Sequence, residues 1–158
     1  MPPPPIMDIA SLDLDATYAD LAQIQAVNPQ RYEFQLLDRV IHMDKETRLF
    51  AGFTEVKEGD WWARGHVPGR PLFPGVLMIE AAAQLCSFVW HDALETEGRF
   101  LGFAAVDDVK YRGAVQAPCR FVMIGHCTKL TLRRTVANTQ GYVDGKMVFE
   151  GTVTGMPV

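Results

Sequence analysis

The sequence predicts a single α+β domain in which an antiparallel sheet curls around one long helix. The length supports this prediction, because 158 residues fit one domain with a sizeable core. The run from Gly75 to about Leu94 is apolar on every face, which is typical of a buried helix. Strand-like segments lie on both sides of this run, and most of them are spaced as hairpins. The predicted domain covers residues 1–158.

The chain before the central helix predicts one short helix and one hairpin. A helix is expected over Ala16–Val27, with Asp15 able to cap it. Strands are expected over Phe34–Met43 and Arg48–Val56, joined by a short polar turn. A loop rich in tryptophan, proline and glycine follows, and Pro74 suits the first position of the central helix.

The chain after the central helix predicts three strand segments: Phe100–Gly113, Arg120–Ala137 and Gln140–Gly155. The middle segment is long enough to bend or to contain a bulge. The sheet is therefore expected to have about five or six strands. One sheet cannot cover a helix that is apolar all round, so we expect a second copy of the chain to complete the cover.

Composition narrows the classes of function. The net charge is −4, from 15 basic and 19 acidic residues, which argues against general nucleic-acid binding. No apolar run approaches the roughly 18 residues of a membrane helix. The opening "MPPPPIMDIASLDLDA" lacks a basic or apolar signal region, so we expect a cytoplasmic protein with a flexible, proline-rich lead-in over residues 1–15. The three cysteines and four histidines lack the spacing of a disulfide framework or metal site.

A lone carboxylate inside the apolar helix is the first candidate for chemistry. Burial raises the pKa of a carboxyl group, which would suit Glu80 to act as a general acid near neutral pH. Gln84 lies four residues later on the same face and can orient this carboxyl group. His66, in the loop before the helix, is the candidate base, because neutral imidazole is the usual base at this pH.

The start of the helix offers an oxyanion site. The backbone N–H groups of Gly75 and Val76 are free at the positive end of the helix dipole. A base, an acid and an oxyanion site together suit removal of a proton next to a carbonyl, followed by loss of a β-substituent. Each feature also has an ordinary explanation. His66 could have a structural role, and Glu80 could pair with an arginine or reach solvent. The prolines and glycines before the helix could simply form a rigid turn.

The stretch His66–Gln84, "HVPGRPLFPGVLMIEAAAQ", resembles the signature of the β-hydroxyacyl-(acyl carrier protein) dehydratases of the FabZ family. Segments Pro29–Val40, Gly102–Val115 and Val143–Val153 also resemble strands of that family. The similarity spans about Asp20 to Met156. It implies the hot-dog fold, a long helix wrapped by a curved antiparallel sheet.

The resemblance also implies a reaction. His66 would remove the C2 proton of a 3-hydroxyacyl thioester, and Glu80 from the partner subunit of a dimer would protonate the departing hydroxyl. The amide of Gly75, with that of Val76, would polarise the thioester carbonyl. The product would be a trans-2-enoyl thioester, formed without a metal or organic cofactor. A glutamate at position 80 favours the FabZ group over the related dehydratase-isomerases, which carry aspartate there.

Three departures from the family pattern change the expected walls of the site. Val67 stands where the family has phenylalanine after the catalytic histidine. Trp61 and Trp62 replace smaller phenylalanines and can reshape the acyl channel, or they can simply pack in the core. The resemblance therefore leaves acyl chain length open.

An acidic acyl carrier protein requires a local basic patch for docking. Five residues are candidates, although each could equally lie on a solvated strand face: Lys110, Arg112, Lys129, Arg133 and Arg134. A coenzyme A thioester could use the same charges. Two other functions on the same fold stay open, a non-catalytic acyl-carrier-binding subunit and a hot-dog thioesterase. The family resemblance allows a dimer or a trimer of dimers.

Overall fold

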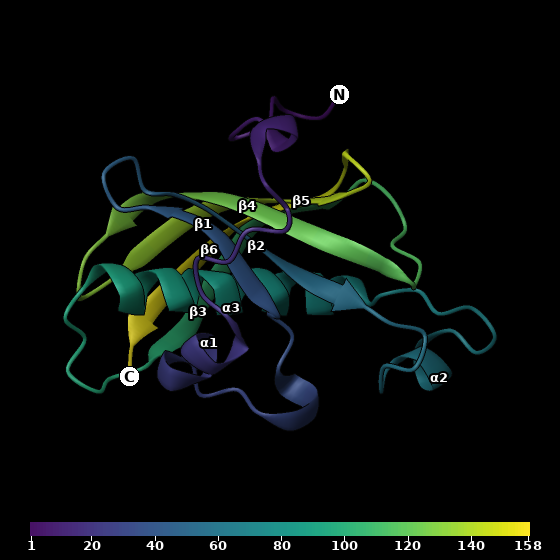
Figure 1. Cartoon of the computed structure of the whole chain (residues 1–158), viewed down its shortest axis with the longest axis horizontal. Helices are drawn as coiled ribbons and strands as arrows, with labels where there is room; N and C mark the ends of the chain where they lie inside the picture. Colours follow the sequence, from purple (N-terminus) through teal and green to yellow (C-terminus); the bar gives the residue numbers. More distant parts are fainter.

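The computed structural model describes residues 1–158 and contains one six-stranded sheet with the order β1-β2-β4-β5-β6-β3. Every neighbouring pair of strands is antiparallel. The strands are β1 (Arg39–Asp44), β2 (Leu49–Val56), β3 (Leu101–Tyr111), β4 (Cys119–Leu130), β5 (Thr135–Val143) and β6 (Lys146–Pro157). The sheet curls strongly, so that its concave side encloses a helix (Figure 1).

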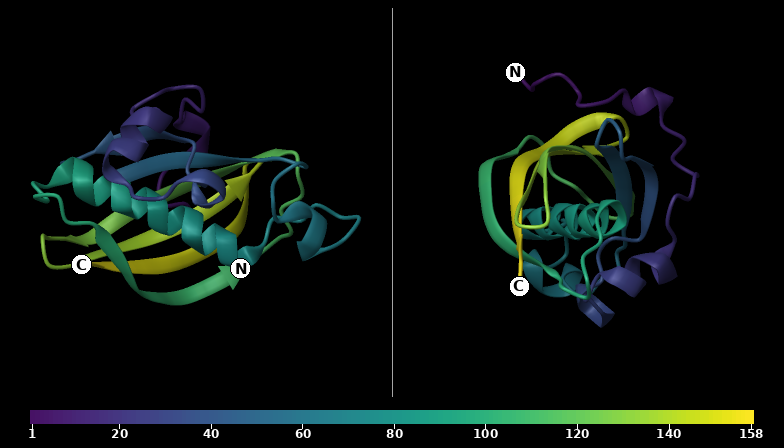
Figure 2. Two further views of the ribbon diagram at one scale, coloured as in Figure 1. Left: turned by 90° about the horizontal axis from the view of Figure 1, so that it is seen from below. Right: turned by 90° about the vertical axis from the view of Figure 1, so that its left-hand side faces the viewer.

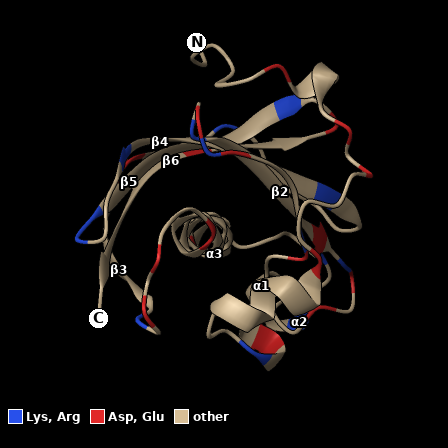
Figure 3. Ribbon diagram, turned by 60° about the vertical axis from the view of Figure 1, so that its left-hand side comes forward, with Lys and Arg blue, Asp and Glu red and all other residues tan.

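The enclosed helix is α3 (Gly75–Ala93), which confirms the predicted central helix to within one residue at its end. Pro74 is the residue that precedes the helix, not its first helical residue. The right-hand view of Figure 2 shows α3 inside the curve of the sheet, and Figure 3 shows that this helix carries few charged residues. Side chains such as Leu85 and Trp90 are fully buried against the concave side of the sheet. The predicted α+β fold class is therefore confirmed.

The first helix is shorter than predicted. It is α1 (Leu21–Val27), and its cap is Asp20, not Asp15. Asp20 accepts a hydrogen bond from the backbone of Gln23, whose side chain accepts one in return from the backbone of Asp20. This reciprocal capping box favours the later start. The backbone before it pairs instead with Val40 of β1.

Three predicted strand segments are also wrong. The expected strand Phe34–Met43 begins only at Arg39, because the preceding backbone is bound by the side chain of Gln84. The expected segment Arg120–Ala137 is not one strand: β4 and β5 are separated by a turn in which Thr131 bonds to Arg134. The expected segment Gln140–Gly155 likewise contains a hairpin turn, at Asp144–Gly145, where both residues have positive φ.

The loop before α3 contains one short helix, α2 (Ala63–His66). It lies beyond the end of the curled sheet, as Figure 1 shows. No helix of the structure combines the length and the apolar character that crossing a membrane would require.

The N-terminal residues cross the convex side of the sheet (Figure 2, right). Gln140 holds this segment, because its side chain accepts from the N–H of Ile6 and donates to the carbonyl of Pro4. Several apolar side chains of the segment pack on the outer face of the sheet: Ile6, Met7, Ile9, Leu12 and Leu14. The flexibility expected of residues 1–15 stays a prediction.

Candidate active site

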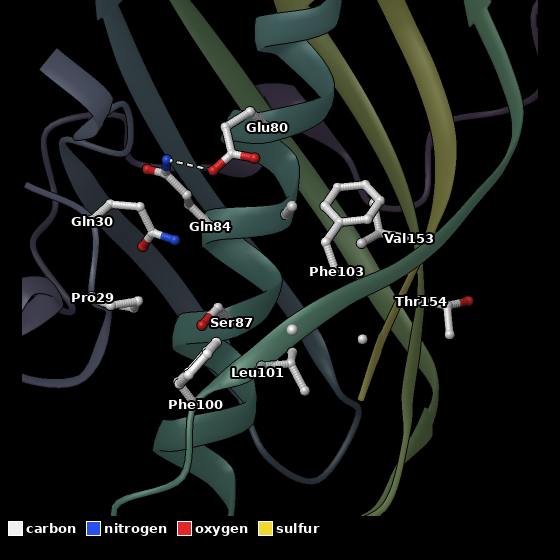
Figure 4. A pocket seen from close by; sticks show the side chains of 13 residues that line it. Pro29, Gln30, Glu80, Gln84, Ser87, Phe100, Leu101, Phe103, Val153 and Thr154 are labelled. Carbon is white, nitrogen blue, oxygen red and sulfur yellow. Dashed lines mark hydrogen bonds between the residues drawn. The ribbon is translucent and has the colours of Figure 1, made fainter. Parts of the chain in front are cut away.

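Glu80 lies on the second turn of α3 and is half-buried at the edge of a cavity. Burial raises the pKa of this carboxyl group above its ordinary value, and a hydrogen bond from Gln84 partly opposes the shift. The Nε2 of Gln84 lies 3.0 Å from Oε1 of Glu80 (Figure 4). A carboxyl group that keeps its proton to higher pH, and is held by one fixed donor, can act as a general acid.

Gln84 is itself fixed by the chain before β1. Its side chain is only 1% exposed, and Oε1 accepts from the backbone N–H groups of Leu36 and Leu37 at 3.0 and 3.1 Å. Its Nε2 donates to the carbonyl of Phe34 at 2.8 Å as well as to Glu80. The amide thereby uses both donors and both acceptor positions, and this pattern sets its orientation. The sequence predicted the pairing with Glu80 but not these three backbone contacts.

His66 is the last residue of α2 and is exposed to solvent. Its Nδ1 lies 2.9 Å from the carbonyl oxygen of Leu72. Because a carbonyl oxygen only accepts, Nδ1 carries the proton, and a neutral ring then presents Nε2 as a free base. The geometry therefore gives His66 the tautomer that removal of a substrate proton needs.

The start of α3 is crowded beside Gly75 and exposed to solvent at Val76. The N–H groups of Gly75 and Val76 lie in the first turn, where an α-helix offers no acceptor. A Cβ on Gly75 would lie 2.8 Å from the ring of Tyr111, so only glycine fits beneath this ring. Tyr111, at the end of β3, is a neighbour of the site that the sequence did not single out. Its strand was part of the family resemblance, but nothing marked this side chain.

A cavity of about 190 Å³ lies beside Glu80, between α3, the chain before β1, and strands β3 and β6 (Figure 4). Gln84 and Ser87 line it from α3, and Gln30 lines it from the opposite side. Phe100, together with other residues around the start of β3, closes the end remote from Glu80. The sequence did not predict that Gln30 and Ser87 face this cavity, because their meeting depends on the tertiary fold.

Within one chain, the structure does not bring the two proposed catalytic groups into the same cavity. Glu80 lines the cavity on α3, whereas His66 is not among the residues that line it. Trp62 is buried and packs against Phe73, with ring centroids 5.5 Å apart. Trp61 is exposed and donates its indole N–H to the carbonyl of Glu33. These tryptophans, and the partly buried Val67, also lie outside the cavity beside Glu80.

The five basic candidates for carrier docking fall into two groups. Lys110 and Arg112 flank Tyr111, and therefore lie near the start of α3. Lys129, Arg133 and Arg134 lie at the β4–β5 hairpin, near the end of α3, where Trp90 bonds to Thr131. Arg112 also pairs with Glu150 at 2.7 Å, which offsets part of its charge. Because the two groups lie near opposite ends of α3, a single docking surface for the carrier would use only one of them.

Solved structures with a similar fold include a mutant thioesterase from Pseudomonas aeruginosa, with a TM-score of 0.66 and 18% identity over 92% of this chain and all of that one. A dehydratase heterocomplex from Xenorhabdus doucetiae has a TM-score of 0.69 and 13% identity over 85% of this chain and 90% of that one. At these identities the likeness concerns the fold alone. It confirms the hot-dog class, which serves both dehydratases and thioesterases.

Sequence comparison is more specific. The model of the FabA-like domain family matches residues 28–152. A curated relative, the 3-hydroxyacyl-(acyl-carrier-protein) dehydratase FabZ of Fusobacterium nucleatum subsp. nucleatum, is 31% identical over 135 residues, which is 85% of this chain and 94% of that protein. The chain therefore belongs to the FabA/FabZ dehydratase family.

Proposed function

We propose that the chain dehydrates 3-hydroxyacyl thioesters carried by an acyl carrier protein to trans-2-enoyl thioesters, in fatty acid or related lipid biosynthesis. One observation carries the proposal: Glu80 is a half-buried carboxyl group with a raised pKa, held by Gln84 at the edge of a cavity. Membership of the dehydratase family, and the name of the relative from Fusobacterium nucleatum, support the same reaction.

The proposed reaction uses one base, one acid and one oxyanion site. Nε2 of His66 removes the C2 proton, and the electrons of that bond form the C2–C3 double bond. Glu80 gives its proton to the C3 hydroxyl, which leaves as water when the C3–O bond breaks. The N–H of Gly75, with that of Val76, stabilises the negative charge that develops on the thioester oxygen. Proton transfer from His66 to Glu80 then restores the starting state. No metal or organic cofactor takes part.

The active site is proposed to form between two subunits. His66 and Gly75 would come from one subunit and Glu80 from its partner, because one chain does not place His66 in the cavity of Glu80. β3 has a free edge, since it pairs only with β6. Phe103 and Tyr111 on this strand are exposed aromatic residues, which suits an edge that a second copy covers. Higher assembly of such dimers stays open.

Docking of the carrier is proposed beside the start of α3. Lys110 is exposed there and lies next to Tyr111, which contacts Gly75. A carrier protein whose phosphate group or acidic helix contacted Lys110 would place its acyl thioester near the proposed oxyanion site. Lys110→Glu should therefore raise KM for the carrier-linked substrate more than Lys129→Glu, which lies at the far hairpin.

A reaction assay distinguishes the three functions that this fold supports. Purified protein would be given 3-hydroxyacyl thioesters of several lengths on acyl carrier protein. Dehydration gives the absorbance of an enoyl thioester, hydrolysis releases a free thiol, and a binding subunit gives neither. Enoyl product with the wild type, and none with Glu80→Gln, is the expected result. Thiol release without enoyl product would replace the proposal with a thioesterase.

A further inference from the structure

The cavity beside Glu80 continues along α3, and its far end carries polar side chains among apolar ones (Figure 4). Glu80, Gln84 and Ser87 occupy one face of the helix, at spacings of four and three residues. All three line the same cavity. Gln84 is fully engaged with its backbone partners, so Ser87 is the next polar group that a ligand would meet beyond Glu80.

Two buried polar groups at this end have no partner in the protein. The side chain of Ser87 is 5% exposed, and its hydroxyl makes no hydrogen bond. The side-chain oxygen of Gln30 is also buried without a partner, and the amide points toward α3 from the opposite side (Figure 4). Buried polar groups are nearly always paired, because an unpaired one costs free energy. Neither residue has a task in the proposed dehydration.

We propose that Gln30 and Ser87 bind a polar group on the acyl chain, so that the enzyme favours substrates with a second hydroxyl remote from the reacting carbons. This proposal rests on the proposed dehydratase function and adds the substrate class. The amide oxygen of Gln30 can accept a hydrogen bond, and the hydroxyl of Ser87 can donate or accept one. A hydroxyl group on the acyl chain can both donate and accept, so it could bond to both residues. Phe100 and Leu101 line the same end and would pack against the neighbouring methylene groups.

Helix geometry gives the approximate position of that hydroxyl. Ser87 follows Glu80 by seven residues, which corresponds to about 10 Å along α3. An extended carbon chain advances about 1.2 Å per bond, so this distance corresponds to eight or nine bonds beyond C3. A chain that leaves C3 at Glu80 and runs along the helix would therefore bring about carbon 12 to Ser87.

The direct test compares three thioesters on acyl carrier protein: 3-hydroxydodecanoyl, 3,12-dihydroxydodecanoyl and the positional control 3,6-dihydroxydodecanoyl. For the wild type, kcat/KM should be about tenfold higher for the 3,12-dihydroxy substrate than for the unsubstituted one. Ser87→Ala and Gln30→Leu should each lower this preference about fivefold, and the double variant should reverse it. The 3,6-dihydroxy substrate should gain nothing.

Thr154→Val is the matched control, because Thr154 lines the cavity from β6 while its hydroxyl points away from α3 (Figure 4). It should leave the preference unchanged. Ser87→Ala improves helix propensity, and Gln30 lies outside any helix or strand, so both variants should fold.

Two results would overturn the inference, and they differ from each other. Turnover of all three substrates without a preference for the 3,12-dihydroxy chain, or with a preference that both variants retain, would overturn the polar subsite and leave the dehydratase intact. No turnover of any substrate by the folded wild type would overturn the proposed function and the subsite together.

Discussion

Gln84 connects Glu80, the proposed general acid, to the chain before β1. Its replacement by leucine should therefore affect both stability and catalysis. Leucine is similar in size but leaves the carbonyl of Phe34 and the N–H groups of Leu36 and Leu37 without partners. Each unpaired buried group costs about 1–3 kcal/mol, although relaxation toward solvent recovers part of this cost. We expect the free energy of unfolding to fall by about 3 kcal/mol in total. For a chain of this size, Tm should then fall by about 6–12 °C.

The same variant should change the pH dependence of turnover. The hydrogen bond from Gln84 lowers the pKa of Glu80 against the effect of burial, so its loss should raise that pKa further. A general acid works in its protonated form. The decline of kcat/KM at high pH that reports Glu80 should therefore move to higher pH in Gln84→Leu.

Gln140→Leu is the control for this experiment. Gln140 is also a buried glutamine, but its backbone partners are Pro4 and Ile6 on the convex side of the sheet, and its oxygen also accepts from the hydroxyl of Tyr142. It should lower Tm without moving the pH profile. Urea and thermal unfolding, with pH–rate profiles for both variants, would test the pair. A loss below about 1 kcal/mol in Gln84→Leu, or an equal pH shift in both variants, would refute this reasoning.

Two further predictions concern single contacts. Gly75→Ala should lower Tm, because the new Cβ would lie 2.8 Å from the ring of Tyr111. The double variant Gly75→Ala/Tyr111→Leu should recover most of that loss in Tm. If the losses of the two single variants simply add in the double variant, the predicted contact is wrong. Glu80 should make folding less stable as pH rises from its unfolded pKa to its raised folded pKa, because the folded state holds the proton more tightly. Glu80→Gln should flatten that slope in urea unfolding measured across this pH range, and an unchanged slope would show that Glu80 is not the group responsible.

The central helix and the pairing of Glu80 with Gln84 were predictable because their signals are local. An apolar run of this length indicates burial from the sequence alone, and Glu80 and Gln84 share a face at any helix of normal geometry. The hairpin of β1 and β2 was predictable for the same reason. The family resemblance then added the hot-dog fold and the proposed reaction in which His66 and Gly75 take part.

The parts that escaped prediction depend on distant residues. Phe34–Leu37 has the composition of a strand, but its hydrogen bonds go to the side chain of Gln84, far along the chain. Asp15 and Asp20 are both possible caps, and only the reciprocal bond of Gln23 decides between them. The meeting of Gln30 with the helix face of α3 likewise requires the tertiary fold.

Subunit complementation tests the central claim most directly. His66→Ala and Glu80→Gln would be expressed separately and together, and each preparation would be assayed with a 3-hydroxyacyl thioester on acyl carrier protein. Each single variant should be an inactive folded oligomer. Random pairing of the two in one dimer should restore about a quarter of wild-type turnover, because half of the dimers then hold one intact site. Recovery to that level would establish both residues and the shared site, whereas activity in either single variant, or no recovery in the mixed dimers, would contradict the mechanism.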